Sequence, residues 1–304
     1  MKRTGLRAVL SAVLLMIGVL ALQAQLLYKV KGRGLRDASY IFGTHHLAPL
    51  SMVDSVGGAR EAFDASEVVV GEIDMTVSPL ATAAAMQPYM KAPADSTLSA
   101  VLPAEVYADA ARKFIGLTGL PLESFEEMKP MVAVTVLSVL TAAKLMDNHN
   151  PAEQLDSYFQ TRGMADGKSV RALETAAEQA ELLYDTRSIR AQADILLETL
   201  ADPDALAETA RKLNEAYMTR DLETIYLIGV AEESDPQFME QLLTRRNRAW
   251  VGKLVEMMEA FPCFIAVGAL HLPGEEGLLN LLKQEGYEII PLDLRDGSTR
   301  TAGR

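Results

Sequence analysis

The stretch SYIFGTHHLAPL (residues 39–50) contains an aromatic and β-branched run that ends at Gly43 and is followed at once by two histidines. A second stretch, FIAVGALHLPG (residues 264–274), has the same order: an apolar run ends at Gly268, and His271 stands three residues further on. A glycine at such a position allows a sharp turn and a close approach of backbone to a ligand. The doubled G-x-x-H pattern therefore predicts two strand ends that bring their histidines into one site.

The segments that follow each G-x-x-H turn predict the fold. Residues 52–65 have the apolar spacing of a helix, and the continuous β-branched run EVVVGEIDM (residues 67–75) is typical of a strand buried on both faces. After the second turn, residues 274–284 predict a helix and residues 287–292 a returning strand. With a further strand at residues 26–31, the chain predicts an α/β (α+β) fold whose mixed central sheet is built from two strand-GxxH-helix-strand units.

A long helical region separates the two units. Residues 80–220 are mostly helical in pattern, with one short strand at 172–173, and a long helix follows from Asp235 to Phe261. The apolar run within 125–147 is only about 16 residues long and contains a lysine, which favours a buried helix over a membrane span. We therefore expect residues 25–304 to form one domain with a helical insertion.

The first 24 residues have the pattern of a secretory signal peptide. Three basic residues precede an apolar run from residue 8 to residue 22, and Ala24 offers a small residue for cleavage. The alternative is a retained membrane anchor, but a core of about 15 residues is shorter than the roughly 20 that a spanning helix needs. The pattern predicts export to the periplasm or the extracellular space, with no membrane span in the mature chain.

Charge and cysteine content narrow the classes of partner. The formal net charge is −12, and loss of the three basic residues of the signal would change it to −15. Such an acidic protein repels nucleic acid and anionic lipid, so neither is expected as a partner.

Cys263, the only cysteine, precedes an apolar strand and is interpreted as a small core residue rather than a nucleophile.

The histidines at the two strand ends are the first candidates for chemistry. His45, His46 and His271 would act as metal ligands or proton shuttles, and the alternative is that they are hydrogen-bonded turn residues. Glu72 and Asp74 occupy alternate positions at the end of the 67–75 strand and are expected to share a face. A buried carboxylate there needs a cationic partner or a metal ion.

Three further polar residues lie beside or within predicted helices. Glu174 directly precedes a predicted capping box and is either a site acid, a helix cap or part of a surface ion pair. Arg246 and Asn247 lie in a basic run, where the functional interpretation is binding of a carboxylate or an oxyanion. The alternative is a solvated face that stacks on Trp250. His149 is interpreted as a solvated loop residue.

The motifs together resemble the TraB/GumN (PrgY-like) family, which includes the Tiki metalloproteases. The resemblance covers nearly all of the chain after the signal and is carried by FGTHHL, VVVGEIDM, MKPMVAV, LDSYF, GKSVRALETAAEQ, RRNRAWVGKL and FIAVGALHLPGEEGLLNLLKQEGYEIIPL. It implies a core similar to that of erythromycin esterase-like and ChaN-like proteins, with the two G-x-x-H motifs facing each other. No G-x-S-x-G, H-E-x-x-H or Walker motif is present.

The resemblance also implies which residues form the site. Its two histidines are His46 and His271, preceded by the motif glycines Gly43 and Gly268, and His45 occupies a variable position. The matched acids are Glu72 and Glu174, and the remaining matched residues are Gln179, Arg246 and Asn247.

These observations predict an exported metal-dependent hydrolase that acts on peptides. His46, His271 and Glu72 would bind Zn, Mn or Co, and Glu174 or Glu72 would be the general base. Two alternatives stay open: a non-catalytic protein that sequesters a peptide signal or a haem-like ligand, and a metal-free esterase-like hydrolase with histidine as base. The expected partner is a peptide or another small-molecule substrate, and the sequence predicts no oligomeric state.

Overall fold

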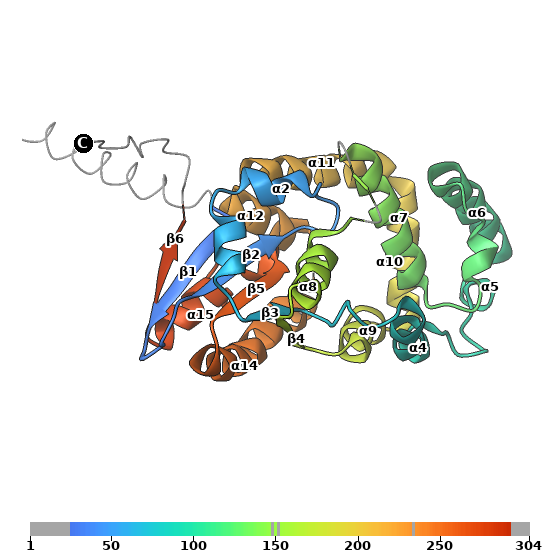
Figure 1. The fold of residues 1–304 in the computed structure, drawn as a ribbon. Coiled ribbons are helices and arrows are strands. Elements are labelled where there is room, and N and C mark those ends of the chain that lie inside the picture. Colours follow the sequence, from blue (N-terminus) through green and yellow to red (C-terminus); the bar gives the residue numbers. More distant parts are fainter. Residues whose placement is uncertain (1–24, 147–148, 151–152, 233–234, 293–304) are drawn as a thin grey trace, which may run out of the picture.

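A computed structural model describes residues 25–146, 149–150, 153–232 and 235–292 (Figure 1). The predicted signal peptide, residues 1–24, and the tail after residue 292 lie outside the described residues. In the described part of the chain, six strands form one sheet in the order β4-β3-β5-β2-β1-β6. Their bounds are β1 (Leu27–Gly32), β2 (Ser39–Thr44), β3 (Val68–Gly71), β4 (Ser169–Ala172), β5 (Cys263–Gly268) and β6 (Tyr287–Pro291).

The sheet is mixed, which confirms the predicted fold class. Strands β4, β3, β5 and β2 run parallel, whereas β1 is antiparallel to both β2 and β6. The two G-x-x-H strands are direct neighbours, with Gly43 opposite Val267 and Thr44 opposite Gly268. Both turns therefore leave the sheet at the same edge.

The two predicted units are interleaved rather than side by side. The crossover from β2 to β3 passes over β5, and the crossover from β5 to β6 passes over β2 and β1. The first crossover contains α2 (Ser51–Ser55) and α3 (Ala59–Asp64). The single helix predicted for residues 52–65 is broken at Gly58, whose φ of 83° is not helical. The second contains the 3₁₀ turn η3 (Ala269–His271) and α15 (Leu278–Gln284).

The region between the units is mostly helical, as the sequence predicts. Its elements are α4 (Pro79–Met90), α5 (Leu98–Val101), α6 (Ala104–Thr118), η1 (Leu122–Phe125), α7 (Pro130–Leu145), α8 (Leu155–Ala165), α9 (Ala176–Asp185), α10 (Ile189–Ala201) and α11 (Pro203–Thr219). Strand β4 joins the sheet from within this region, slightly earlier than predicted. Helix α12 (Leu222–Glu232) was not predicted, since its apolar residues do not mark one face.

The helix predicted for residues 235–261 is divided into three parts. It consists of α13 (Pro236–Met239), the π-helical segment η2 (Glu240–Arg245) and α14 (Arg246–Ala260). Asp235 caps the first part by accepting a hydrogen bond from the Gln237 N–H at 2.9 Å. Short π-helical segments are frequent at functional sites, and this one leads directly into Arg246.

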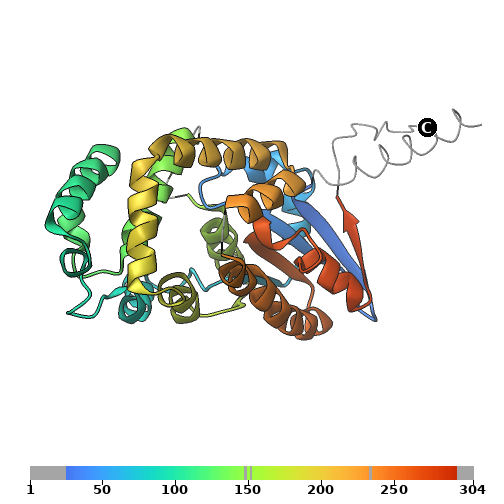
Figure 2. The ribbon, with the colours of Figure 1, turned by 180° about the vertical axis from the view of Figure 1, so that it is seen from behind.

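Three apolar clusters hold the described elements together, the smallest of them formed by Val132, Ala180 and Tyr184 between α7 and α9. The largest core surrounds the sheet and includes Phe42, Phe63, Phe159 and Phe264, whose ring centroids lie 4.7–6.2 Å apart. The second core lies among α5, α6, α7 and α10. Figures 1 and 2 show these helices set to one side of the sheet, with α11 running along the top between the two parts. In the described residues, no helix is long and apolar enough to cross a membrane.

Candidate functional site

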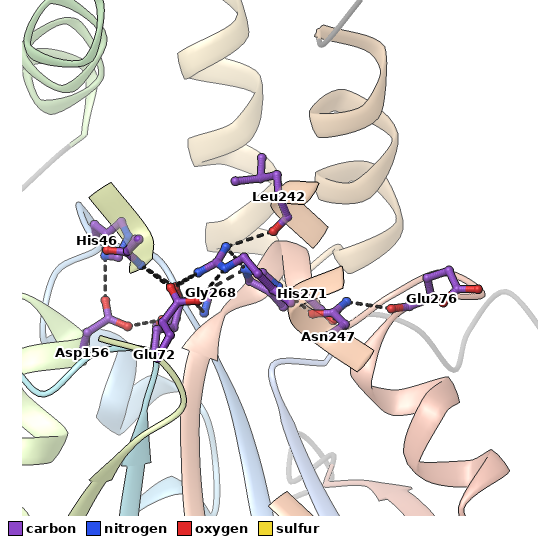
Figure 3. A network of polar contacts seen from close by, with 12 residues as sticks. His46, Glu72, Asp156, Leu242, Asn247, Gly268, His271 and Glu276 are labelled. Carbon is purple, nitrogen blue, oxygen red and sulfur yellow. Dashed lines mark hydrogen bonds and ion pairs between the residues drawn. The ribbon is translucent and has the colours of Figure 1, made fainter. Parts of the chain in front are cut away.

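Each of the four parallel strands is followed by one predicted site residue. Crossing the sheet from β4 to β3, β5 and β2, these residues are Glu174, Glu72, His271 and His46. The carboxyl ends of parallel strands are the usual place for ligands in such sheets. Figure 3 shows the labelled residues in a row, from His46 and Asp156 through Glu72 and Gly268 to His271 and Asn247.

Arg246, at the start of α14, is the centre of the site. Its Nε and Nη2 form a two-pronged ion pair with Glu174, at 3.0 and 2.7 Å, and Nη2 also donates to Glu72 Oε2 at 2.8 Å. Its Nη1 donates to the Leu242 carbonyl and to His271 Nε2, both at 3.0 Å. All five N–H bonds of the guanidinium thus have acceptors within the protein. Arg246 can contact a substrate only by releasing one of them.

His271 is held in one tautomer by its neighbours. Arginine cannot accept a hydrogen bond, so His271 Nε2 carries a lone pair towards Arg246. The proton is therefore on Nδ1, which donates to Asn247 Oδ1 at 2.7 Å. Asn247 is fixed in turn, because its amide donates to the Glu276 carbonyl at 2.7 Å. Burial lowers the pKa of His271 to about 4, so the imidazole is neutral at neutral pH.

Glu72 lies between the two histidines and is ionised. Its Oε1 accepts from the Gly268 N–H at 2.8 Å and lies 3.8 Å from His271 Nε2. Burial alone would raise the pKa of Glu72, but the neighbouring His271, Arg246, His46 and the Gly268 N–H lower it to about 2. Because His271 is neutral at neutral pH, the positive charges that keep Glu72 ionised there are those of Arg246 and His46.

Gln179 joins the two carboxylates from helix α9. Its amide donates to Glu72 Oε2 at 3.2 Å and to Glu174 Oε1 at 3.0 Å. The predicted capping box is present at the start of this helix, where the Thr175 hydroxyl accepts from the Glu178 N–H. The cap therefore fixes the backbone next to Glu174.

His46 differs from His271 in its exposure and in its partner. Its side chain is 68% exposed, whereas that of its partner Asp156 is 8% exposed. The Nδ1–H donates to Asp156 Oδ2 at 2.9 Å, and the Thr44 hydroxyl donates to the other carboxylate oxygen. The charge of Asp156 raises the pKa of His46 to about 9. Neither Asp156 nor Thr44 was predicted, although Asp156 belongs to the motif LDSYF.

The structure places three further residues singled out in the sequence. His45 has the contacts of a hydrogen-bonded turn residue, which was the alternative interpretation: its Nδ1 accepts from the Leu47 N–H at 3.1 Å and its ring packs on Tyr217. Asp74 does not share a strand face with Glu72, because β3 ends at Gly71 and Asp74 accepts from the Thr76 N–H at 2.8 Å. His149 lies in a loop, as expected, but it is partly buried and its Nδ1–H donates to the Leu47 carbonyl at 3.0 Å.

The two motif glycines are needed for close packing. A Cβ atom at Gly43 would lie 2.9 Å from Leu272 Cδ1 and 3.2 Å from the Ala269 backbone. A Cβ atom at Gly268 would lie 3.1 Å from Glu72 Oε1. The G-x-x-H pattern thus reports that the two strand ends pack against each other and against Glu72.

The predicted metal ligands fit a divalent ion by donor type. His46 and His271 both have Nδ1 hydrogen-bonded to an oxygen, an arrangement that orients the Nε2 of metal-binding histidines. Glu72 adds an ionised carboxylate. In the present arrangement, however, Arg246 occupies Glu72 Oε2 and His271 Nε2. Across the described residues, no three His, Cys, Asp or Glu side chains form a ready metal site. Binding of an ion here would require Arg246 to withdraw.

Comparison with known proteins agrees with this set of motifs. The relatives found include metalloprotease TIKI1 of Danio rerio, 24% identical over 83% of this chain and 60% of the relative, and metalloprotease TIKI1 of Homo sapiens, 25% identical over 83% and 59%. The metalloprotease TIKI homolog of Amphimedon queenslandica is 22% identical over 84% and 60%. The chain therefore spans about 60% of the length of these relatives. No solved structure matches significantly. The model of the TraB/PrgY/gumN family matches residues 26–291, and the chain therefore belongs to that family.

Proposed function

We propose that this protein is an exported hydrolase that cleaves peptide bonds with the help of a divalent metal ion. The observation that carries the proposal is the gathering of His46, Glu72, His271 and Glu174 at the carboxyl ends of four adjacent parallel strands. The similarity to proteins named metalloproteases supports the reaction class. The signal-peptide pattern of residues 1–24 supports export to the periplasm or the extracellular space.

Each residue of the cluster has a role in this proposal. His46 and His271, through Nε2, and the Glu72 carboxylate would hold the ion, a donor set that suits Zn, Mn or Co. Such an ion would lower the pKa of a bound water and polarise the scissile carbonyl. Glu174 accepts the proton of the attacking water. Arg246, once it has released Glu72 and His271, donates to the developing oxyanion, and Asn247 keeps the His271 ring in place.

The decisive experiment combines metal quantitation with a peptide-library cleavage screen on the purified mature protein. We expect about one divalent ion per chain, loss of cleavage with a chelator, and recovery when the ion is restored. His46→Ala and His271→Ala should each abolish cleavage, whereas His149→Ala, a histidine outside the cluster, should not. A metal-free protein whose cleavage survives both site substitutions would disprove the proposal. Specific binding of a peptide without any product would favour a sequestering protein.

One observation favours a second candidate, a metal-free hydrolase. His46 is exposed and paired with the buried carboxylate of Asp156, an arrangement that makes an imidazole a stronger base. In that case cleavage would persist in excess chelator and still be lost in His46→Ala. His271→Ala would then reduce cleavage less than His46→Ala.

A further inference from the structure

Helix α8 carries two buried polar side chains one turn apart. Asp156 and Gln160 are only 6% and 1% exposed. Residues four apart lie on the same helical face, and this face points at the sheet edge from which the site turns leave. Burying a carboxylate and an amide is unfavourable unless each has hydrogen-bond partners. The partners of Asp156 and Gln160 therefore indicate which parts of the site this helix face holds in place.

The partners of Asp156 are the last residue of β2 and a residue of the turn that follows it. One carboxylate oxygen accepts from the Thr44 hydroxyl and the other from His46 Nδ1 at 2.9 Å. With Nδ1 engaged, Nε2 is the only ring nitrogen of His46 that remains for a substrate or an ion. Asp156 therefore decides which atom of His46 is presented to the site.

The partners of Gln160 both belong to the loop after β3, which carries Glu72. Its side-chain oxygen accepts from the Met75 N–H at 2.8 Å, and its amide donates to the Ile73 carbonyl at 2.9 Å. The fit is tight, because a Cβ atom at Gly71 would lie 2.1 Å from Gln160 Nε2. Gln160 thus holds the backbone of the loop immediately after Glu72.

The helix that bears both residues is firmly fixed to the sheet. Between them, Phe159 packs on Phe264 and Phe42, with ring centroids 4.7 and 5.1 Å apart. Further along, a Cβ atom at Gly163 would lie 2.6 Å from a methyl group of Val69. Helix α8 therefore offers a rigid base for the two polar side chains.

We propose that Asp156 and Gln160 are positioning residues: Asp156 directs the ring of His46, Gln160 fixes the loop that places Glu72, and together they set the spacing of these two groups. This inference rests on the proposed function only in that His46 and Glu72 are the working groups. Partners that orient metal or catalytic groups typically contribute about 10- to 100-fold to activity or metal affinity.

The first test compares kinetics of conservative variants. Asp156→Asn keeps the shape of the side chain and should lower kcat by about tenfold or more with little change in KM. Asp156→Glu should have a higher kcat than Asp156→Ala. Gln160→Glu should likewise have a higher kcat than Gln160→Leu, because its side chain can still accept a hydrogen bond from the Met75 N–H. The matched control is Asp166→Asn, an exposed carboxylate at the other end of α8 that pairs with Arg162. A wild-type kcat in folded Asp156→Asn would overturn the proposal.

The second test needs no activity and uses the metal-free protein. Proton NMR should show a His46 Nδ1–H signal protected from exchange in the wild type and in Asp166→Asn, and lost in Asp156→Ala. If Asp156→Ala fails to fold, the same signal is compared in Asp156→Asn, where it should shift. An unchanged signal would overturn the role of Asp156 even if the protein is an active metallopeptidase. A lost signal in a protein that cleaves no peptide would support it while the proposed function fails.

Discussion

At the scale of single residues, Arg246 is the group on which the buried charge of the site depends. Its side chain is 11% exposed, and those of Glu72 and Glu174 are 12% and 8% exposed. Arg246→Met would leave two buried carboxylates without a cation, and removing one partner of a buried ion pair typically costs about 3–5 kcal/mol. We expect a loss of this size in the free energy of unfolding, measured by urea denaturation.

Arg248 provides the control for that prediction. It lies two residues further along the same helix and forms a two-pronged pair with Glu276, but its side chain is 64% exposed. Exposed pairs contribute about 0–1 kcal/mol, so Arg248→Met should have a much smaller effect. Equal losses in the two variants would contradict the central role of Arg246.

Cys263 gives a second prediction at this scale. The residue is fully buried, and burial raises the pKa of its thiol to about 12. Since the thiolate is the reactive form, the native protein should not react with Ellman's reagent at pH 8, well below that pKa. One thiol per chain should react after denaturation. Rapid reaction of the native protein would show that the start of β5 opens readily, and Cys263→Ser would serve as the blank.

The sequence was sufficient to predict that these residues lie close together, but not which residues they form hydrogen bonds with. The doubled G-x-x-H pattern brings His46 and His271 to one edge because strand ends in a parallel sheet meet there. Asp156 gave no such signal, since nothing in a helical sequence tells which polar residue turns towards the sheet. The sequence also did not reveal that every N–H of Arg246 has an acceptor, because these acceptors come from four separate segments of the chain. The catalytic and metal-binding roles of these residues stay predictions.

At the scale of elements, the capping box of α9 links helix stability to the site. Thr175→Ala removes an N-cap and should cost about 1 kcal/mol. Because Thr175 follows Glu174 directly, this variant should also lower peptide cleavage. Ser188→Ala removes the comparable cap of α10, where the hydroxyl accepts from the Ala191 N–H at 3.3 Å. Ser188→Ala should lower the stability of the protein by a similar amount without affecting cleavage. Equal loss of activity in the two variants would argue against a specific link between the cap of α9 and the site.

Element boundaries failed where tertiary contacts override local preference. The β-branched run EVVVGEIDM predicts a strand to residue 75, yet β3 ends at Gly71. Glu72 turns to the Gly268 N–H, and the backbone of Ile73 and Met75 bonds Gln160 instead of a strand. Helix α12 was not predicted for a different reason: its apolar residues cover more than one face, so the sequence lacks the periodic pattern of an amphipathic helix. Long periodic helices such as α11 were predicted closely.

At the scale of the whole molecule, the separation of the sheet core from the core of α5, α6, α7 and α10 predicts unequal local stability. Phe114 lies in the core of α5, α6, α7 and α10, whereas Phe264 lies in the sheet core, and both are fully buried. Each substitution by alanine should cost about 3–5 kcal/mol. We expect Phe114→Ala to speed amide hydrogen exchange mainly in the four helices, and Phe264→Ala to speed it throughout. Uniform acceleration in Phe114→Ala would show that the cores unfold as one unit.

The pairing of β1 with β6 has a consequence for the order of the chain. Tyr28 lies opposite Pro291, and the Leu292 N–H donates to the Leu27 carbonyl at 2.9 Å, so the first strand begins beside the end of the last strand. A short linker could join them, and new ends could be opened at Gly167, an exposed turn at the strand ends remote from the site. Such a circular permutant should fold and keep the site intact, since the site depends on which strand ends are neighbours and not on the order in which the ribosome makes them.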